Sequence, residues 1–228
     1  YVHFEPYNDI MNIKKKDYDF RFYDNEVLLS GNIILRPTGL TGSGTMQLDK
    51  AKVTSNYFKY NAIFFNADTA DLVVNANEMG GIAFSSKNLR TYIDLDERIG
   101  LFYSNGADSY MDLPENEYIC YIDKLRWDMD LDQLKLGENK DNTSGTRFIS
   151  IDPLQDSISF LAKTANYNLN DYIINAYGVD SILVADAIIY PDSGKLFVEK
   201  SAKIRTLYNA TVIANNLTQY HTFKKSTY

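Results

Sequence analysis

The sequence predicts an all-β protein. Short apolar runs recur at intervals of about 8–12 residues, separated by clusters of Gly, Asn, Asp and Ser, and no stretch has a convincing helical period. The chain is also rich in Tyr and Phe, with 18 and 12 copies, and aromatic residues favour half-buried pleated surfaces. These observations predict a stacked-strand solenoid, β-helix or trough-like, with a two-sheet β-sandwich of ordinary hairpins as the alternative.

Composition narrows the functional classes. The 228 residues are 45% hydrophobic with a net charge of −7, which is enough apolar material for a large core. The basic clusters at 14–16 and 224–225 are short, which argues against nucleic-acid binding. The single cysteine, Cys120, excludes an internal disulfide and lies in an apolar stretch typical of an inert buried thiol. No apolar run approaches the ~18 residues of a membrane-spanning helix, so no transmembrane segment is expected.

The N-terminal part reads as a series of strands and turns. Tyr18, Phe20 and Phe22 alternate with polar residues as in a strand. A bent strand or strand pair, broken at 30–32, is expected from Val27 to Arg36, where Pro37 ends it. Further strands are expected at 46–53, 57–65, 68–74, 82–86, 89–95 and 99–104, with turns at 54–56, 66–67, 87–88 and 105–106.

The glycine-rich stretch from Thr38 to Gly44 lacks the features of a phosphate-binding loop. No Gly-Lys-Ser/Thr follows it, and the next segment alternates like a strand instead of opening a helix. The stretch is therefore expected to be a flexible β turn.

Residues 115–136 are the one segment with a competing helical pattern. Tyr118, Ile122, Leu125 and Met129 share a helical face, whereas the strand template matches more positions. We expect one long strand with a bulge near 132–133. Its apolar face would carry Ile119, Tyr121, Leu125, Trp127, Met129 and Leu131.

Polar residues at 139–145 are the strongest loop signal and the expected boundary between an N-terminal β portion (1–138) and a C-terminal β portion (146–228). The two portions are also compatible with one continuous solenoid. In the tail, Ala-centred strands occur around Ala187, Ala202 and Ala210, and the turn at 190–194 combines Pro, Asp, Ser and Gly.

No motif predicts catalytic, cofactor-binding or metal-binding residues. The acids at 128, 130 and 132 resemble the start of a calcium loop, but Gln133 and Asn139 occupy positions where an EF-hand needs Gly and Glu. The acids are better explained as the solvent-exposed face of a strand. Further acids could serve a glycosidase, although acids are ordinary at turns. Basic residues of the tail could serve a polysaccharide lyase, although salt-bridged surface bases are commoner. These residues are Asp68, Asp71, Asp94, Asp96, Glu97, Lys195, Lys200, Lys203 and Arg205.

The stretch SGNIILRPTGLTGSGTMQLDKAKVTS, followed by NADTADLVV, resembles the glycine-punctuated strands of bacterial envelope β-solenoids. These are the OstA-like lipopolysaccharide-transport and translocation-and-assembly-module proteins, and segments of long cell-envelope proteins are similar. The resemblance covers residues 27–75, and no functional residue transfers from it. It implies strands that stack into an apolar-lined trough, in a periplasmic or cell-surface location.

The sequence therefore predicts a non-catalytic β-rich module of a larger extracytoplasmic or cell-envelope protein, with a scaffold, envelope-assembly or binding role. Its partners would be envelope lipid, glycan or neighbouring domains of the same chain. A carbohydrate-binding β-sandwich that uses exposed Tyr side chains is the alternative, and a glycan-active β-helix enzyme is a third hypothesis. The first predicts no convergent polar cluster, the second coplanar exposed rings, and the third acids and bases in one groove.

Overall fold

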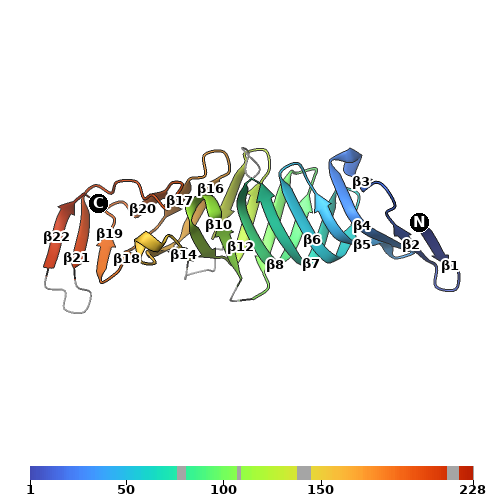
Figure 1. Ribbon diagram of the computed structural model, residues 1–228, viewed down its shortest axis with the longest axis horizontal. Coiled ribbons are helices and arrows are strands. Elements are labelled where there is room, and N and C mark those ends of the chain that lie inside the picture. The colour runs from blue at the N-terminus through green and yellow to red at the C-terminus, as the bar shows by residue number, and fades with distance from the viewer. Residues whose placement is uncertain (76–80, 107–108, 138–144, 215–220, 228) are drawn as a thin grey trace.

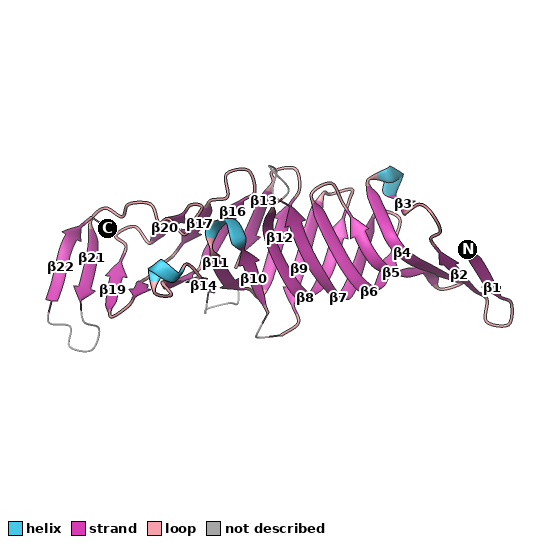
Figure 2. Cartoon of the chain, viewed as in Figure 1, coloured by secondary structure: helices cyan, strands magenta, loops and turns pink. Residues whose placement is uncertain are grey.

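The computed structural model describes residues 1–75, 81–106, 109–137, 145–214 and 221–227. Within them, 22 strands hydrogen-bond into a single antiparallel sheet that does not close into a barrel. The molecule is elongated, and its two termini lie toward opposite ends (Figure 1). Helical structure in the described ranges is limited to three 3₁₀ turns (Figure 2). The all-β prediction is confirmed.

Five long strands form the middle of the sheet. They pair in chain order as an antiparallel meander. These strands are β4 (Val27–Arg36), β5 (Gly39–Gln47), β6 (Ala51–Tyr60), β7 (Phe64–Asn75) and β8 (Ile82–Asp94).

At β8 the ladder divides, because the two ends of this strand have different partners. Ser85 and Ser86 pair with β10, whereas the residues from Leu89 to Asp94 pair with β9. The first branch, here called half I, contains β10 (Tyr110–Leu113), β11 (Tyr118–Tyr121), β14 (Thr146–Ser150), β15 (Ser159–Ala162), β18 (Ile182–Val184), β19 (Ala187–Tyr190), β21 (Ala210–Ala214) and β22 (His221–Ser226). The second branch, half II, contains β9 (Ile99–Ser104), β12 (Lys124–Asp128), β13 (Gln133–Leu136), β16 (Thr164–Asn168), β17 (Ile174–Tyr177) and β20 (Lys195–Val198).

The long strands contribute to both halves, so the sheet is folded lengthwise with its two halves packed face to face. At the N-terminal end, β1 (Val2–Glu5) and β2 (Ile10–Lys14) extend half II, and β3 (Phe20–Phe22) extends half I. The 3₁₀ turns are η1 (Tyr23–Asn25), η2 (Pro114–Asn116) and η3 (Pro153–Gln155).

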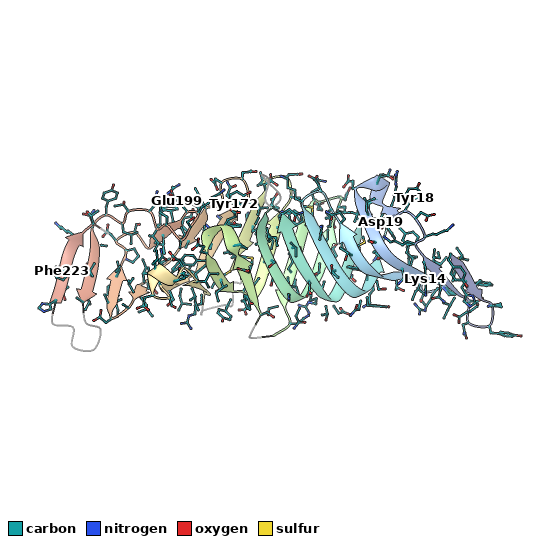
Figure 3. The ribbon with its side chains drawn as sticks, viewed as in Figure 1. Lys14, Tyr18, Asp19, Tyr172, Glu199 and Phe223 are labelled. Carbon is teal, nitrogen blue, oxygen red and sulfur yellow. The ribbon has the colours of Figure 1, made fainter. Side chains whose placement is uncertain are left out.

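The two long edges of this folded sheet differ. Along one edge, here called the spine, the chain passes between the halves through the bends of β4–β8 and through the connections at 122–123, 163, 178–181 and 191–194. Along the other edge, the mouth, hairpin turns of half I face hairpin turns of half II. The mouth runs along the top of Figure 3, where Tyr172 and Glu199 are labelled.

In β6, β7 and β8 the alternation of buried and exposed residues shifts by one residue at the spine, where each strand bends. Buried positions alternate along each half, but at the bend they are three residues apart instead of two. The register shifts at 67–72 in β7, and Asn88 of β8 has a positive φ of 57°. An extra residue of this kind is a β-bulge, which bends a strand and re-aims its side chains. Both halves of each strand therefore direct apolar residues into the same interior.

In β4 and β5 the bend depends on glycine. Gly31 pairs with Gly44, and a Cβ on Gly31 would lie 1.9 Å from the carbonyl oxygen of Ser43. A Cβ on Gly44, whose φ is +130°, would lie 2.3 Å from the oxygen of Ser30. The predicted flexible turn at Thr38–Gly44 is thus wrong, since Gly39–Gln47 is strand β5. The glycines serve close backbone approach inside it.

The other turns that were predicted within these strands are wrong for the same reason. The residues at 54–56, 66–67 and 87–88 lie inside β6, β7 and β8. Small and polar residues mark bends of continuous strands there, not breaks between strands.

Residues 115–136 are neither one long strand nor a helix. They contain η2, strands β11 and β12, a turn at 129–132, and β13. Trp127 faces inward as expected, but Tyr118 and Cys120 are buried in place of Ile119 and Tyr121. The expected bulge at 132–133 is the end of a hairpin turn, where Asp132 has a φ of 49°. Alternation alone does not show where a chain leaves one layer for the other.

The interior between the halves is filled by side chains from both. Its largest fully buried members are Tyr118, Tyr167, Phe58, Phe65, Phe84, Phe102 and Phe148. The Tyr167 hydroxyl of half II donates to the Ala83 carbonyl of half I across 3.2 Å. Burial raises the pKa of this phenol far above its ordinary value. The core is continuous across the two expected β portions, because β11 pairs with β14 and β13 pairs with β16. The loop expected at 139–145 lies almost wholly outside the described residues.

The tail follows the same plan. The turn expected at 190–194 is present, with the Gly194 N–H donating to the Pro191 carbonyl at 3.3 Å and a Gly194 φ of 63°. It carries the chain from half I to half II. Ala187 and Ala210 begin strands β19 and β21, whereas Ala202 lies in a turn with a φ of 53°.

Candidate functional site

The mouth is where polar and charged side chains from the two halves meet. At the N-terminal end, the Tyr23 hydroxyl of η1 donates to the Phe64 carbonyl of half II at 2.8 Å. Further along, Lys50, in the β5–β6 turn of half I, pairs with Asp132 in the β12–β13 turn of half II at 2.5 Å. These contacts join hairpin turns that the backbone does not connect.

Arg98 is the centre of a second bridge. It lies in the β8–β9 turn of half II with a positive φ of 51°. Its Nε donates to Asp130 at 2.5 Å, and its Nη1 lies 3.5 Å from Glu26 beside η1. The hydrogen bond to Asp130 and the charges of Asp130, Glu26 and Asp49 raise the pKa of the guanidinium, which stays charged. The arginine thus neutralises acids from both halves.

These bridges border a pocket of about 410 Å³. Six of its ten lining residues are charged and four are apolar. The lining residues are Glu26, Leu48, Asp49, Lys50, Leu95, Arg98, Trp127, Met129, Asp130 and Asp132. We call this the mouth pocket.

Two residues that line the mouth pocket each have a polar atom that is buried away from solvent and unpaired among the described residues. The Trp127 side chain is 2% exposed and its indole Nε1 has no hydrogen-bond partner. Oδ1 of Asp132 is likewise buried and unpaired, although its Oδ2 meets Lys50. Buried polar groups are nearly always hydrogen-bonded in folded proteins, so an unpaired buried donor and an unpaired buried acceptor are both unusual.

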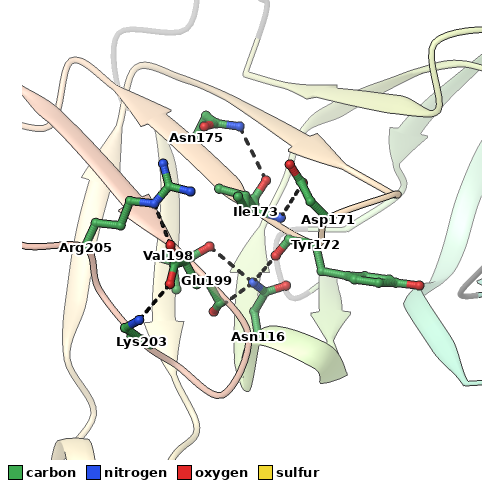
Figure 4. A network of polar contacts seen from close by, with 9 residues as sticks. All are labelled: Asn116, Asp171, Tyr172, Ile173, Asn175, Val198, Glu199, Lys203 and Arg205. Atoms are coloured by element: carbon green, nitrogen blue, oxygen red, sulfur yellow. Dashed lines mark hydrogen bonds and ion pairs between the residues drawn. The ribbon is translucent and has the colours of Figure 1, made fainter. Parts of the chain in front are cut away.

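Toward the C-terminal end the mouth is closed by Asn116 of η2 (Figure 4). Its fully buried side-chain amide donates to the carbonyls of Tyr172 at 2.6 Å, Glu199 at 3.1 Å and Val198 at 3.3 Å. These carbonyls belong to the β16–β17 turn, to the end of β20 and to the residue that follows it. The backbone of η2 adds two bonds, as Ser201 donates to Glu115 and Ala202 to Asn116, each at 2.9 Å. One amide therefore fastens three segments of the chain.

Three basic residues of the C-terminal tail form ion pairs around the same turns. Glu199 accepts from Arg205 at 2.6 Å and from Lys203 at 3.1 Å, which lowers its pKa (Figure 4). Lys200 pairs with Glu115 at 3.5 Å. Lys195 lies on the outer side of β20. They are spread over ion pairs at the surface rather than gathered in a groove.

Three of the acids considered as glycosidase groups stabilise turns or form ion pairs. Asp94 accepts from the backbone N–H groups of Asp96 and Glu97 and from the Tyr92 hydroxyl, so it stabilises the β8–β9 turn. Asp68 pairs with Lys59 at 3.3 Å, and Asp71 accepts from the Asn88 N–H.

The acids at 128–132 lie at the mouth and not along one strand face. Asp128 ends β12, whereas Asp130 and Asp132 belong to the following turn. The interpretation as a solvent-exposed strand face is therefore wrong for these two. Among the described residues, no group of three or more His, Cys, Asp or Glu side chains is arranged to hold a metal ion.

Exposed aromatic residues do not share one plane at the clearest place where they meet. Tyr110 and Tyr121 are opposite one another on β10 and β11, and both are exposed. Their ring centroids are 6.3 Å apart, with a 59° angle between the ring planes. This pair gives no flat platform for a sugar ring.

Cys120 is buried in half I, and burial raises the pKa of its thiol far above the ordinary value. A thiol in this state is a poor nucleophile.

Sequence reasoning missed the mouth pocket, because its lining comes from turns that are far apart in the chain. Lys50 and Asp132 are separated by 82 positions. The only local signal was the cluster of acids after Trp127.

Comparisons with known proteins add no relative. No protein-family model matches the chain, and no curated protein and no solved structure matches it. In the described part of the chain, no helix has the length and apolar character needed to cross a membrane.

Proposed function

We propose that the chain is a non-catalytic structural module of a larger extracytoplasmic or cell-envelope protein, in which it spans distance as a scaffold. The supporting observation is the ladder that runs through the molecule from one end to the other. Every strand pair in the described ranges is antiparallel, and the termini lie toward opposite ends (Figure 1). A chain that enters at one end and leaves at the other is suited to hold its neighbours apart.

The filled interior supports a scaffold more than a lipid carrier. Five phenylalanines and two tyrosines occupy the space between the halves with almost no exposure. Such packing resists opening, because separating the halves would expose the whole apolar core. A scaffold was expected to lack a convergent polar cluster, and the mouth has one. Most of its charged groups form ion pairs between or beside the hairpin turns, so they hold the two halves together.

The edge strands at the two ends of the sheet could pair with strands of a neighbouring domain. In the described residues, β1 and β3 end the ladder on one side, and β20 and β22 end it on the other. Edge strands present unpaired N–H and C=O groups that accept a further strand. Neighbouring domains of the same chain are the partners that this arrangement favours.

A replacement experiment tests the scaffold. In the producing cell, residues 1–228 of the protein would be exchanged for an unrelated β-rod of equal length, or for one of half that length. A scaffold predicts that the equal-length rod restores function and the short rod does not. Failure of both rods, together with loss of binding to an envelope glycan preparation, would instead favour the carbohydrate-binding alternative. Cell fractionation of the tagged protein would test the envelope location.

A further inference from the structure

The two halves of the sheet end out of step at both ends of the molecule. At the N-terminal end, half I stops at β3, whereas half II continues from β4 through β2 to β1. At the C-terminal end, half I stops at β22, and half II stops at residues 203–205, here called the Ile204 segment, where Ile204 bridges to Val198 of β20. Counted outward from β8 in the described residues, β22 is the eighth strand of half I and the Ile204 segment the seventh of half II. Each end therefore has an overhang of one strand, and the two overhangs belong to opposite halves.

Each overhang exposes apolar side chains on its inner face. Val2 of β1 is 57% exposed and Phe4 is 52% exposed, and Val2 lies opposite Ile13, which packs against the core. Phe223 of β22 is 55% exposed and lies opposite Val212, which also packs against the core. Cross-strand partners share a face of the sheet. The apolar interior therefore continues onto both overhangs, where no second layer covers it among the described residues.

The directions of the edge strands allow one end of the molecule to continue the other. In half I, β22 runs from the mouth to the spine and β3 from the spine to the mouth. In half II, the Ile204 segment runs from the mouth to the spine and β1 from the spine to the mouth. A second copy placed end to end would therefore meet antiparallel neighbours at both edges, as in the rest of the sheet. In the same arrangement, β22 would lie over β1 of the second copy, so each overhang would fill the step left by the other.

Charges favour one register at the edge of half I. With Phe223 opposite Phe20 of the second copy, Lys224 lies opposite Asp19. A shift by two residues, which also keeps the apolar faces aligned, would place Lys224 opposite Arg21. Opposite charges directly across a strand pair are favourable and like charges are not. Phe223 and Asp19 are labelled toward opposite ends of the molecule (Figure 3).

The edge of half II has the same complementarity. With Ile204 opposite Phe4 of the second copy, Lys203 lies opposite Glu5. Lys203 is exposed, and Glu5 accepts hydrogen bonds from neutral asparagine amides. Such surface pairs contribute little affinity, but they select the register in which two edges meet.

We propose that the chain associates end to end with a second copy of itself, with the C-terminal end of one copy overlapping the N-terminal end of the next. β22 pairs with β3, the Ile204 segment pairs with β1, and Phe223 covers Val2 and Phe4. The contact joins two different surfaces, so it repeats along the long axis instead of closing. It deepens the scaffold role by naming the neighbour that the two ends bind. It is tested on residues 1–228 in solution, so it can fail while the replacement experiment succeeds.

One exposed phenylalanine at each end provides the first test. Sedimentation velocity is expected to show monomers at low protein concentration and growing chains at high concentration. Phe223→Glu and Phe4→Glu each place a charge where the joint buries a ring, and each should weaken association at least about tenfold. Tyr57→Glu is the matched control, because Tyr57 is 47% exposed on β6 in the middle of the sheet. It should associate like the parent, and all three variants should keep the parent's unfolding free energy.

The two end variants together distinguish a head-to-tail joint from a symmetric one. Phe223→Glu keeps an intact N-terminal end and Phe4→Glu an intact C-terminal end, so an equimolar mixture should form one joint and stop at a dimer. A symmetric contact between two β22 edges would instead let Phe4→Glu dimerise by itself. That result would overturn the proposal.

Cysteine pairs test the register. In the expected alignment, Thr222 lies opposite Arg21 of the next copy. Thr222→Cys mixed with Arg21→Cys should form a disulfide-linked dimer under mild oxidation, whereas neither variant alone should. The native Cys120 does not compete, because its thiol is buried. Linkage of either variant to itself, or a parent protein that stays monomeric up to about 1 mM, would overturn the proposal and leave the ends to a neighbouring domain of another kind.

Discussion

The long strands β4–β8 and the short hairpins from β10 onward build the same two layers in different ways. In the first region each strand continues through the spine into the other half, so the layers are joined by covalent backbone at every strand. In the second region hairpins alternate between the halves, as β10–β11, β12–β13, β14–β15 and β16–β17 do. There the mouth is held by side chains, with Asn116 as the main fastening.

The difference indicates where each region is vulnerable. The N-terminal region depends on backbone approach at its bends, and a single Cβ can disturb it. The C-terminal region depends on the bonds that Asn116 Nδ2 donates at the mouth, while Asn116 Oδ1 is buried without a partner among the described residues. The loss of this one side chain can disturb the region. Three substitutions and one labelling experiment test this comparison.

The largest effect is expected at the spine. Gly31→Ala places a Cβ within 1.9 Å of the Ser43 oxygen, and relieving this clash requires movement of two paired strands. The free energy of unfolding should fall by about 3 kcal/mol or more, measured by urea denaturation. Gly106→Ala is the control, because its nearest neighbour would be 4.0 Å away. A Gly31→Ala protein as stable as this control would show that the bend does not need glycine.

The next effect is expected at the mouth. Asn116→Ala removes the donor of three carbonyl groups in a fully buried place. Leaving such groups unpaired should cost about 2–3 kcal/mol of unfolding free energy. Asn61→Ala, at an exposed hairpin turn of half II, is the control and should cost far less. Similar losses for both would contradict the role of Asn116 as a fastening.

Cys120 reports whether the two regions open together. Its thiol is buried in β11, two strands from the end of the long meander. Burial raises its pKa, so labelling by a disulfide reagent at pH 8 should be roughly a hundredfold or more slower in the native protein than in urea. At equal loss of stability, Asn116→Ala should accelerate labelling more than Gly31→Ala. Equal acceleration would mean that the whole ladder opens as one unit.

The smallest effect is expected at Asp112 of β10. Its Oδ1 is buried without a partner among the described residues, and burial raises its pKa above 3.8. The native state therefore keeps the proton to higher pH than the unfolded chain does, and unfolding free energy is lost as the pH rises through this window. Asp112→Asn removes that loss. The variant should match the parent below about pH 4 and exceed it by about 1 kcal/mol or less at pH 7, in thermal melts across this range. Equal stability at both pH values would contradict the burial of a charge there.

The sequence predicts the strand content well because alternation and turn residues are local signals. It fails at the bends, where the same residues that end strands elsewhere allow a strand to continue. Asn88 and Gly44 illustrate this, since both have positive φ inside strands. Only the pairing partners, which lie in other segments, distinguish a bend from a turn.

The candidate site was predictable in part. The acids after Trp127 were visible as a cluster, but their chemistry depends on Lys50 and Arg98, which reach them across the mouth. The sequence also contains nothing that separates Asn116 from the other asparagines of the chain. Its importance comes from burial between η2 and the turns of half II, which is a property of the assembled layers.

The strands run across the long axis of the molecule, whereas the termini lie toward its two ends (Figure 1). A pulling force applied at the termini therefore acts at right angles to the strands. It loads the ladder hydrogen bonds one pair at a time, like a zipper, instead of shearing many at once. We therefore expect the fold to resist compression along its long axis and to extend gradually under tension. Strands released in sequence from either end would lengthen the chain at low force while the middle of the sheet keeps its core.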